Sequence, residues 1–292
     1  MTAFVIILVL CSTFMHAGWN LLARYERSET VFYSKMLIAV TVIGFVPAIG
    51  SEIVTRSLTP TAWACVTGSG IFLAVYFFAL ARAFGASDFT VVYPVARALP
   101  VIFVAIIDVL RQRYLTSIGW LGIALVAAGC FLVPLHSFKD IALHKYLNRA
   151  SFWMLVAALG TVAYTLLDKI AAEVVQQYPA TSARYGYLTF AICVVPYVAL
   201  LRAFKRCNNN SDTLGWKLAI PAGILSFGAY WLVLWAYQLS PYASYIVAFR
   251  QFSIVIGAVL AFLIYKEQGV VVRLAGASLI TAGLVLIGGW GR

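Results

Sequence analysis

The chain divides almost completely into apolar runs of about 20 residues, the length that crosses the hydrocarbon core of a bilayer. Of its 292 residues 63% are hydrophobic and only 11% are charged, against about 25% charged in a soluble domain. A soluble fold of this size could not bury so much apolar surface. The sequence therefore predicts an all-α integral membrane protein of ten transmembrane helices, over residues 3–23, 31–50, 61–81, 88–110, 117–135, 151–171, 180–201, 215–238, 241–264 and 269–290.

These runs form two similar halves. Residues 1–135 hold five runs, residues 136–150 are the longest connecting loop, and residues 151–292 hold five more. GWNLLAR at 18–24 resembles AYTLLDK at 163–169. Because five is odd, the second half must enter the membrane in the opposite direction. We therefore expect two inverted five-helix repeats, a plan common in secondary transporters that brings equivalent positions together at the midplane.

Arg97 and Arg250 occupy matching places in the two halves, within SDFTVVYPVARALPVIF and SPYASYIVAFRQFSIVI. Neither has an acidic residue within eight positions. A charge at mid-membrane depth costs about 2.5–3.5 kcal/mol on insertion scales. We expect the pair to bind an anionic group near the midplane. The alternative is a structural role, in which each guanidinium snorkels to the interface or binds carbonyls freed by a kink.

Other polar residues in the runs have two interpretations each. Lys35 and Arg184, at matching positions, are expected to line the pathway mouths and attract anions, or else to snorkel to the interface. His16 is the one histidine inside a run; it is expected to carry a proton, or else to hydrogen-bond a neighbouring helix. Asp168 and Lys169 end the sixth run and are expected to face the interface.

A further set is expected to contact the substrate because it adds aromatic walls and hydrogen bonds around the two arginines. Packing and hydrogen bonding between helices are the alternative roles for the same side chains. The set is Trp19, Asn20, Tyr93, Tyr164, Thr165, Tyr230, Trp231 and Gln251.

Several function classes are excluded by what the sequence lacks. Four of the five cysteines lie in apolar runs without a CxxC pair, so neither a disulfide frame nor a metal site is expected. The net charge of +11 is spread over short loops and forms no basic stripe, which argues against nucleic acid as a partner. No cluster of nucleophile, base or metal ligands suggests an enzyme, and no cofactor is expected.

The order and spacing of several motifs resemble the drug/metabolite transporter superfamily, in particular its EamA-like ten-span family. The motifs are ALPVIFVAII at 98–107, LIYKEQ at 263–268 and LAGASLITAGLVLIG at 274–288. Glu267 stands where the family has a turn glutamate, whereas Arg113 takes that position in the first half. The resemblance implies a secondary transporter with a central cavity between the halves that works by alternating access.

Together these features predict a transporter of a small anionic or zwitterionic metabolite bearing a carboxylate, phosphate or phosphonate. Alternatives are an exporter of amino acids, amines or drug-like compounds, and a non-transport membrane protein. The expected partners are the substrate and the lipid bilayer, in the plasma membrane (the inner membrane of a bacterium). An oligomer is compatible with the sequence but not required. The loop charges place both termini outside the cell, whereas the family resemblance implies the reverse.

Overall fold

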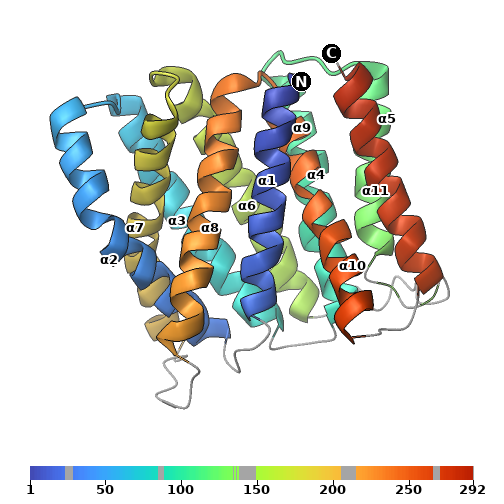
Figure 1. Ribbon diagram of the computed structural model, residues 1–292, viewed down its shortest axis with the longest axis horizontal. Coiled ribbons are helices and arrows are strands. Elements are labelled where there is room, and N and C mark those ends of the chain that lie inside the picture. The colour runs from blue at the N-terminus through green and yellow to red at the C-terminus, as the bar shows by residue number, and fades with distance from the viewer. Residues whose placement is uncertain are drawn as a thin grey trace.

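The computed structural model describes residues 1–23, 29–84, 89–133, 135, 137, 149–204, 215–265 and 270–291, with their side chains except those of 29, 84, 89–96, 149 and 261–265. Every regular element in these ranges is an α-helix. The helices stand side by side in one bundle, and both chain ends lie at the same end of it (Figure 1). They are α1 (Ala3–Ala23), α2 (Glu29–Thr55), α3 (Pro60–Phe84), α4 (Phe89–Leu110), α5 (Ser117–Leu132), α6 (Arg149–Val174), α7 (Pro179–Ala203), α8 (Trp216–Leu239), α9 (Ala243–Arg250), α10 (Phe252–Tyr265) and α11 (Val270–Trp290).

The predicted all-helical membrane class is confirmed. Eight spans among the described residues are long and apolar enough to cross a membrane, and Ser117–Leu132 is a shorter apolar helix. Large apolar side chains such as Val46 and Val54 on α2 face outward, as expected where the solvent is lipid. Most of the predicted loop 136–150 lies outside the described residues, and α6 begins at Arg149.

The predicted span 241–264 is not one continuous helix. It divides at Gln251 into α9 and α10, where Gln251 N–H bonds the Ala248 carbonyl and Ser253 Oγ donates to the Arg250 carbonyl over 2.9 Å. The start of α9 is held by α4, since Asp108 Oδ2 accepts Ser244 N–H at 2.8 Å. A carboxylate there satisfies an otherwise unbonded N–H and complements the positive end of the helix.

The most extensive helix pairs are α3 on α6, α5 on α11, α1 on α8 and α3 on α7. Between α5 and α11 the two backbones approach closely at glycine. A Cβ on Gly129 would lie 2.5 Å from the Gly276 carbonyl oxygen, and one on Gly283 would lie 2.5 Å from that of Gly122. Small residues allow such contact between membrane helices, where dispersion rather than the hydrophobic effect drives association.

An ion pair joins α2 to α7. Arg184 Nε lies 3.2 Å from Glu52 Oε2, and the two side chains are only 11% and 9% exposed. Arg184 also donates to Ser51 Oγ at 2.7 Å and to Ser57 Oγ at 3.0 Å. Glu52 also accepts the Leu58 N–H. Together with the bonds of Arg184, this interaction fixes the end of α2 against α7.

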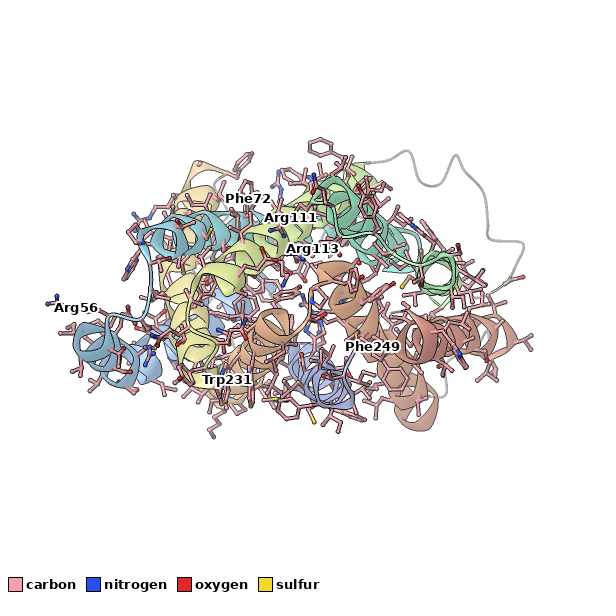
Figure 2. The ribbon with its side chains drawn as sticks, turned by 90° about the horizontal axis from the view of Figure 1, so that it is seen from above. Arg56, Phe72, Arg111, Arg113, Trp231 and Phe249 are labelled. Carbon is pink, nitrogen blue, oxygen red and sulfur yellow. The ribbon has the colours of Figure 1, made fainter. Side chains whose placement is uncertain are left out.

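A second charged cluster lies at one end of the bundle. Glu173 on α6 contacts Arg111 at 2.7 Å, Arg113 at 3.7 Å and Lys169 at 3.3 Å, and Figure 2 shows the two arginines close together. Lys169 also donates to the carbonyl of Ser240 at 2.6 Å, at the C-terminal end of α8. The prediction that Lys169 faces the interface is therefore wrong: it is 3% exposed and bonds orphan carbonyls of a neighbouring helix.

The close contact between α5 and α11 predicts that adding one methyl group at a contact glycine strongly lowers the stability of the protein. We expect Gly129→Ala to lower the unfolding temperature of the detergent-purified protein by several degrees, because overpacking costs about 1–3 kcal/mol. Gly257→Ala is the matched control, since a Cβ at that helical glycine meets nothing within 4 Å. Intrinsic-fluorescence melting measures both variants. Equal melting temperatures for the two would show that α5 and α11 do not pack this closely.

The α2–α7 ion pair predicts coupled losses of stability. Removing one partner of a nearly buried pair costs about 3–5 kcal/mol, because it leaves the other charge uncompensated. We expect Glu52→Gln and Arg184→Gln each to lower the melting temperature, and the double variant to lose less than the sum. A double-mutant cycle on melting data measures this coupling. Purely additive losses would argue that Arg184 does not act through Glu52.

Candidate functional site

Arg97 of α4 and Arg250 at the end of α9 line the same internal cavity. Its volume is about 40 Å³, well below the roughly 300–1,000 Å³ of typical small-molecule sites. None of the described residues that line it is acidic. They are His16, Asn20, Tyr76, Leu80, Arg97, Pro100, Thr161, Tyr164, Val247, Arg250 and Gln251.

His16 of α1 holds the Arg97 side of this cavity. Its Nε2 lies 3.1 Å from Arg97 Nη2, and its Nδ1 lies 3.1 Å from Trp19 Nε1. Both neighbours are N–H donors, whereas a neutral imidazole has one acceptor nitrogen and an imidazolium has none. A neutral His16 can therefore accept a hydrogen bond from only one of these two donors, and an imidazolium from neither. Asn20 is held one turn away, donating to the His16 carbonyl at 2.7 Å.

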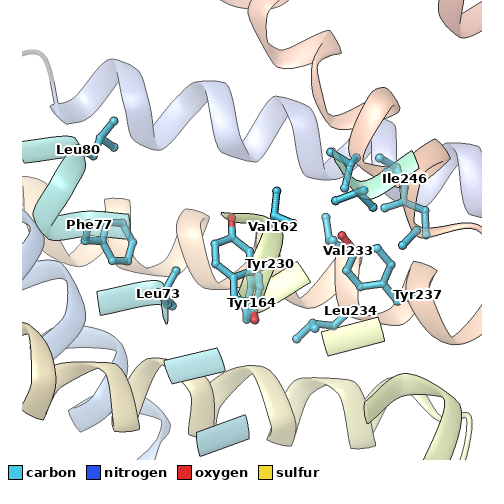
Figure 3. Close-up of a cluster of buried hydrophobic side chains, with 14 of the residues drawn as sticks. Leu73, Phe77, Leu80, Val162, Tyr164, Tyr230, Val233, Leu234, Tyr237 and Ile246 are labelled. Atoms are coloured by element: carbon cyan, nitrogen blue, oxygen red, sulfur yellow. The ribbon is translucent and has the colours of Figure 1, made fainter. Parts of the chain in front are cut away.

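Phenol rings surround Arg250. The Tyr164 phenol hydrogen-bonds its side chain, and Tyr76 and Tyr237 lie close enough to interact electrostatically. Tyr164 makes edge-to-face ring contacts with Tyr76 at 6.1 Å and with Tyr230 at 6.4 Å. Figure 3 shows Tyr164 and Tyr230 side by side in the buried cluster, with Tyr237 nearby. Among the described residues no carboxylate forms an ion pair with Arg250, so its immediate partners are neutral.

A buried carboxylate lies directly behind this wall of phenols. Asp168 is 1% exposed and accepts three hydroxyl groups: Ser69 Oγ at 2.7 Å, Tyr185 Oη at 3.0 Å and Tyr230 Oη at 2.6 Å. These come from α3, α7 and α8, so Asp168 joins four helices. The prediction that it faces the membrane interface is wrong, because residues near the end of a long helix are still covered when neighbouring helices extend past them.

The structure separates the predicted substrate contacts into two groups. Asn20, Tyr164 and Gln251 line the cavity together with both arginines and His16. The remaining described members do not line it. Trp19 hydrogen-bonds His16, and Tyr230 hydrogen-bonds Asp168. Thr165 is fully buried, and Trp231 Nε1 donates to the Pro179 carbonyl at 2.8 Å. The Tyr93 side chain lies outside the described residues.

Of the two predicted pathway mouths, Arg184 is engaged with Glu52, while Lys35 has an interaction partner and is half-buried on α2. Neither lines the central cavity.

The substrate contacts predicted from the sequence did not include Tyr76 and Thr161, which line the cavity, or Asp168 behind it. In the second half, the spacing of polar residues could have indicated this face of the cavity. Thr161, Tyr164 and Asp168 are separated by three and four residues, so they share one face of α6. No comparable pattern marks Tyr76, since α3 carries apolar residues all around.

Comparisons with known proteins agree with this architecture. The model of the EamA-like transporter family matches residues 148–289, which span α6 to α11. A solved crystal structure superposes with a TM-score of 0.71 over 99% of this chain and 98% of that one, at 13% identity, which establishes a shared fold. No curated protein matches the chain. The second half of the chain is therefore similar to the EamA-like transporter family, which belongs to the drug/metabolite transporter superfamily.

Proposed function

We propose that the protein is a secondary transporter that carries a small anionic or zwitterionic metabolite, held between Arg97 and Arg250. The observation that carries this proposal is that both guanidinium groups line one internal cavity whose described lining contains no acid. Two like charges in one enclosed site repel each other. A carboxylate, phosphate or phosphonate between them replaces that repulsion with charge-assisted hydrogen bonds.

One acceptor in the cavity favours a substrate that also has a donor group. Gln251 lines the cavity, and its Nε2 donates to the Val247 carbonyl at 3.0 Å. Its buried Oε1 has no hydrogen-bond donor among the described residues. An unsatisfied buried acceptor costs about 1–3 kcal/mol. An ammonium or hydroxyl on the substrate would satisfy it, so an amino acid or hydroxy acid suits the site better than a bare anion.

Repeated contacts support an inverted repeat, with halves 1–135 and 151–292, as the basis of alternating access. The packing of α3 on α6 has its counterpart in α8 on α1, and that of α4 on α6 in α9 and α10 on α1. In α5 and α11 the glycines of one helix, seven residues apart, face those of the other in reverse order. Because the cavity volume of about 40 Å³ is far below the roughly 300–1,000 Å³ of typical small-molecule sites, we expect these helices to separate when a metabolite enters.

Transport of amines or cationic drugs is the weaker alternative. A cation would need an acidic or π-rich surface free of positive charge, whereas two arginines line this cavity. The nearby acid, Asp168, has both oxygens occupied by hydroxyl donors and does not line the cavity.

Substituting either arginine tests the proposal. We expect Arg97→Gln and Arg250→Gln to reduce substrate binding and transport about 10- to 100-fold, since a hydrogen bond to a charged group contributes about 1.5–3 kcal/mol. Lys217→Gln, at an exposed site in the first turn of α8, is the matched control for loss of one positive charge.

Ligand-induced stabilisation of the purified protein gives the first measurement. The probes are acetate, phosphate, methylphosphonate and glycine, with ethylammonium as the cationic comparison, and hits are then followed as radiolabelled uptake into proteoliposomes. Stabilisation by anions that persists in both arginine variants would contradict the proposal. Stabilisation by ethylammonium alone would favour the amine alternative.

A further inference from the structure

Asp168 differs from the other buried charged groups in the kind of partner it has. Lys169 bonds helix carbonyls, Asp108 bonds a helix N-terminus, and Arg184 pairs with Glu52. Asp168 has no cation within ion-pair distance among the described residues, and each of its three donors is a hydroxyl. An ionised carboxylate buried in this way is costly unless it is paired or hydrogen-bonded, and it readily takes up a proton instead.

Hydroxyl partners suit both charge states of a carboxyl group, because each can donate and accept. Ser69 is already placed for the exchange. Its Oγ lies 2.7 Å from Asp168 Oδ1, 3.2 Å from Tyr185 Oη and 3.4 Å from the Tyr164 carbonyl oxygen, so its one hydrogen has acceptors other than the carboxylate within reach. With Asp168 ionised, Ser69 donates to Oδ1. With a proton on Oδ1, that O–H donates to Ser69 Oγ, and Ser69 turns its hydrogen to the Tyr164 carbonyl.

We propose that Asp168 is a proton-binding site, and that the protein moves a proton together with its anionic substrate in the same direction. This inference rests on the proposed function for its anion, but not for the proton site itself. The proton enters from water on one side as Asp168 is neutralised, and it leaves to water on the other side as the carboxylate re-forms. A proton and a monovalent anion then cross with no net charge.

The coupling follows from the groups that surround Asp168. Arg250 of α9 is close enough to Asp168 to interact with it electrostatically. The other titratable or polar groups around Asp168 are Cys65 and Ser69 of α3, Tyr164 and Lys169 of α6, Tyr185 of α7, and Tyr230 and Tyr237 of α8. Arg250 is thus shared between the cavity and the carboxylate. An anion bound at Arg250 cancels its positive field and adds a negative one, which favours the protonated acid.

By reciprocity, protonation of Asp168 strengthens anion binding, because it removes a competing negative charge from Arg250. Tyr164 provides the mechanical connection. It lies one turn from Asp168 on α6, bonds Arg250 through its phenol and offers its carbonyl to Ser69. The same residue therefore contacts the cavity and the proton site.

Infrared spectroscopy of the reconstituted protein tests the proton site without any ligand. We expect a carboxylic-acid carbonyl band that disappears as pH rises and that is absent from Asp168→Asn. Glu173→Gln, which alters an acid in the end cluster, should retain it. Tyr230→Phe removes the 2.6 Å donor to the carboxylate, so its band should persist to higher pH, which keeps the test valid where Asp168→Asn folds poorly. A band unaffected by both variants would overturn the assignment.

Proton uptake on binding tests the coupling. Calorimetry with acetate, which stays ionised near neutral pH, in buffers of different ionisation enthalpy should show up to about one proton taken up per anion bound in the wild type. Asp168→Asn should bind acetate with no uptake and with little dependence on pH. His16→Gln should retain uptake, whereas loss of uptake there and retention in Asp168→Asn would move the proton site to His16. Failure of acetate to bind, with the infrared band present, would contradict the carboxylate form of the proposed function and leave the proton site standing.

Discussion

The requirement that polar groups inside a lipid-embedded bundle be matched within the protein determines how these helices meet. Water is not there to solvate a buried charge, so each one is satisfied by another helix. Lys169 binds the C-terminal carbonyls of α8, Asp108 binds the first N–H groups of α9, and Arg184 binds Glu52 across α2 and α7. Each interaction fixes the end or the register of one helix on its neighbour. The charged groups thus form the framework, and apolar packing and glycine contacts fill it.

Arg250 does not follow this pattern. Its guanidinium contacts a phenol, and no carboxylate among the described residues pairs with it, so its partner accepts a hydrogen bond but cancels no charge. Arg184, by contrast, pairs with the carboxylate of Glu52. A neutral partner leaves the positive potential of Arg250 available to a ligand, which supports the proposed anion site over a permanent ion pair.

Most of the architecture was readable from the sequence, since apolar runs of membrane-spanning length determine where helices lie. The sequence did not predict the environment of residues whose partners come from other helices. Asp168 and Lys169 are adjacent near a helix end, which suggests the interface, yet α3, α7 and α8 extend far enough to cover them. The Arg97–Arg250 match was informative because it depends only on position within a repeat. The break at Gln251 was missed because no proline or glycine marks it; the Ser253 hydroxyl instead bonds the Arg250 carbonyl.

The break at Gln251 separates the segment that carries Arg250 from α10. Asp108 and Arg97 belong to α4, and Asp108 holds the first turn of α9, whose last residue is Arg250. Arg250 lies six residues beyond Ser244, which places it about 9 Å along the helix from that fixed start. The pair of arginines is therefore set by the attachment of α9 to α4, whereas α10 begins beyond the break and packs on α1 and α11. Under the proposed alternating access, a bend at Gln251 would open the cavity and leave intact the α4–α9 contact that positions both arginines.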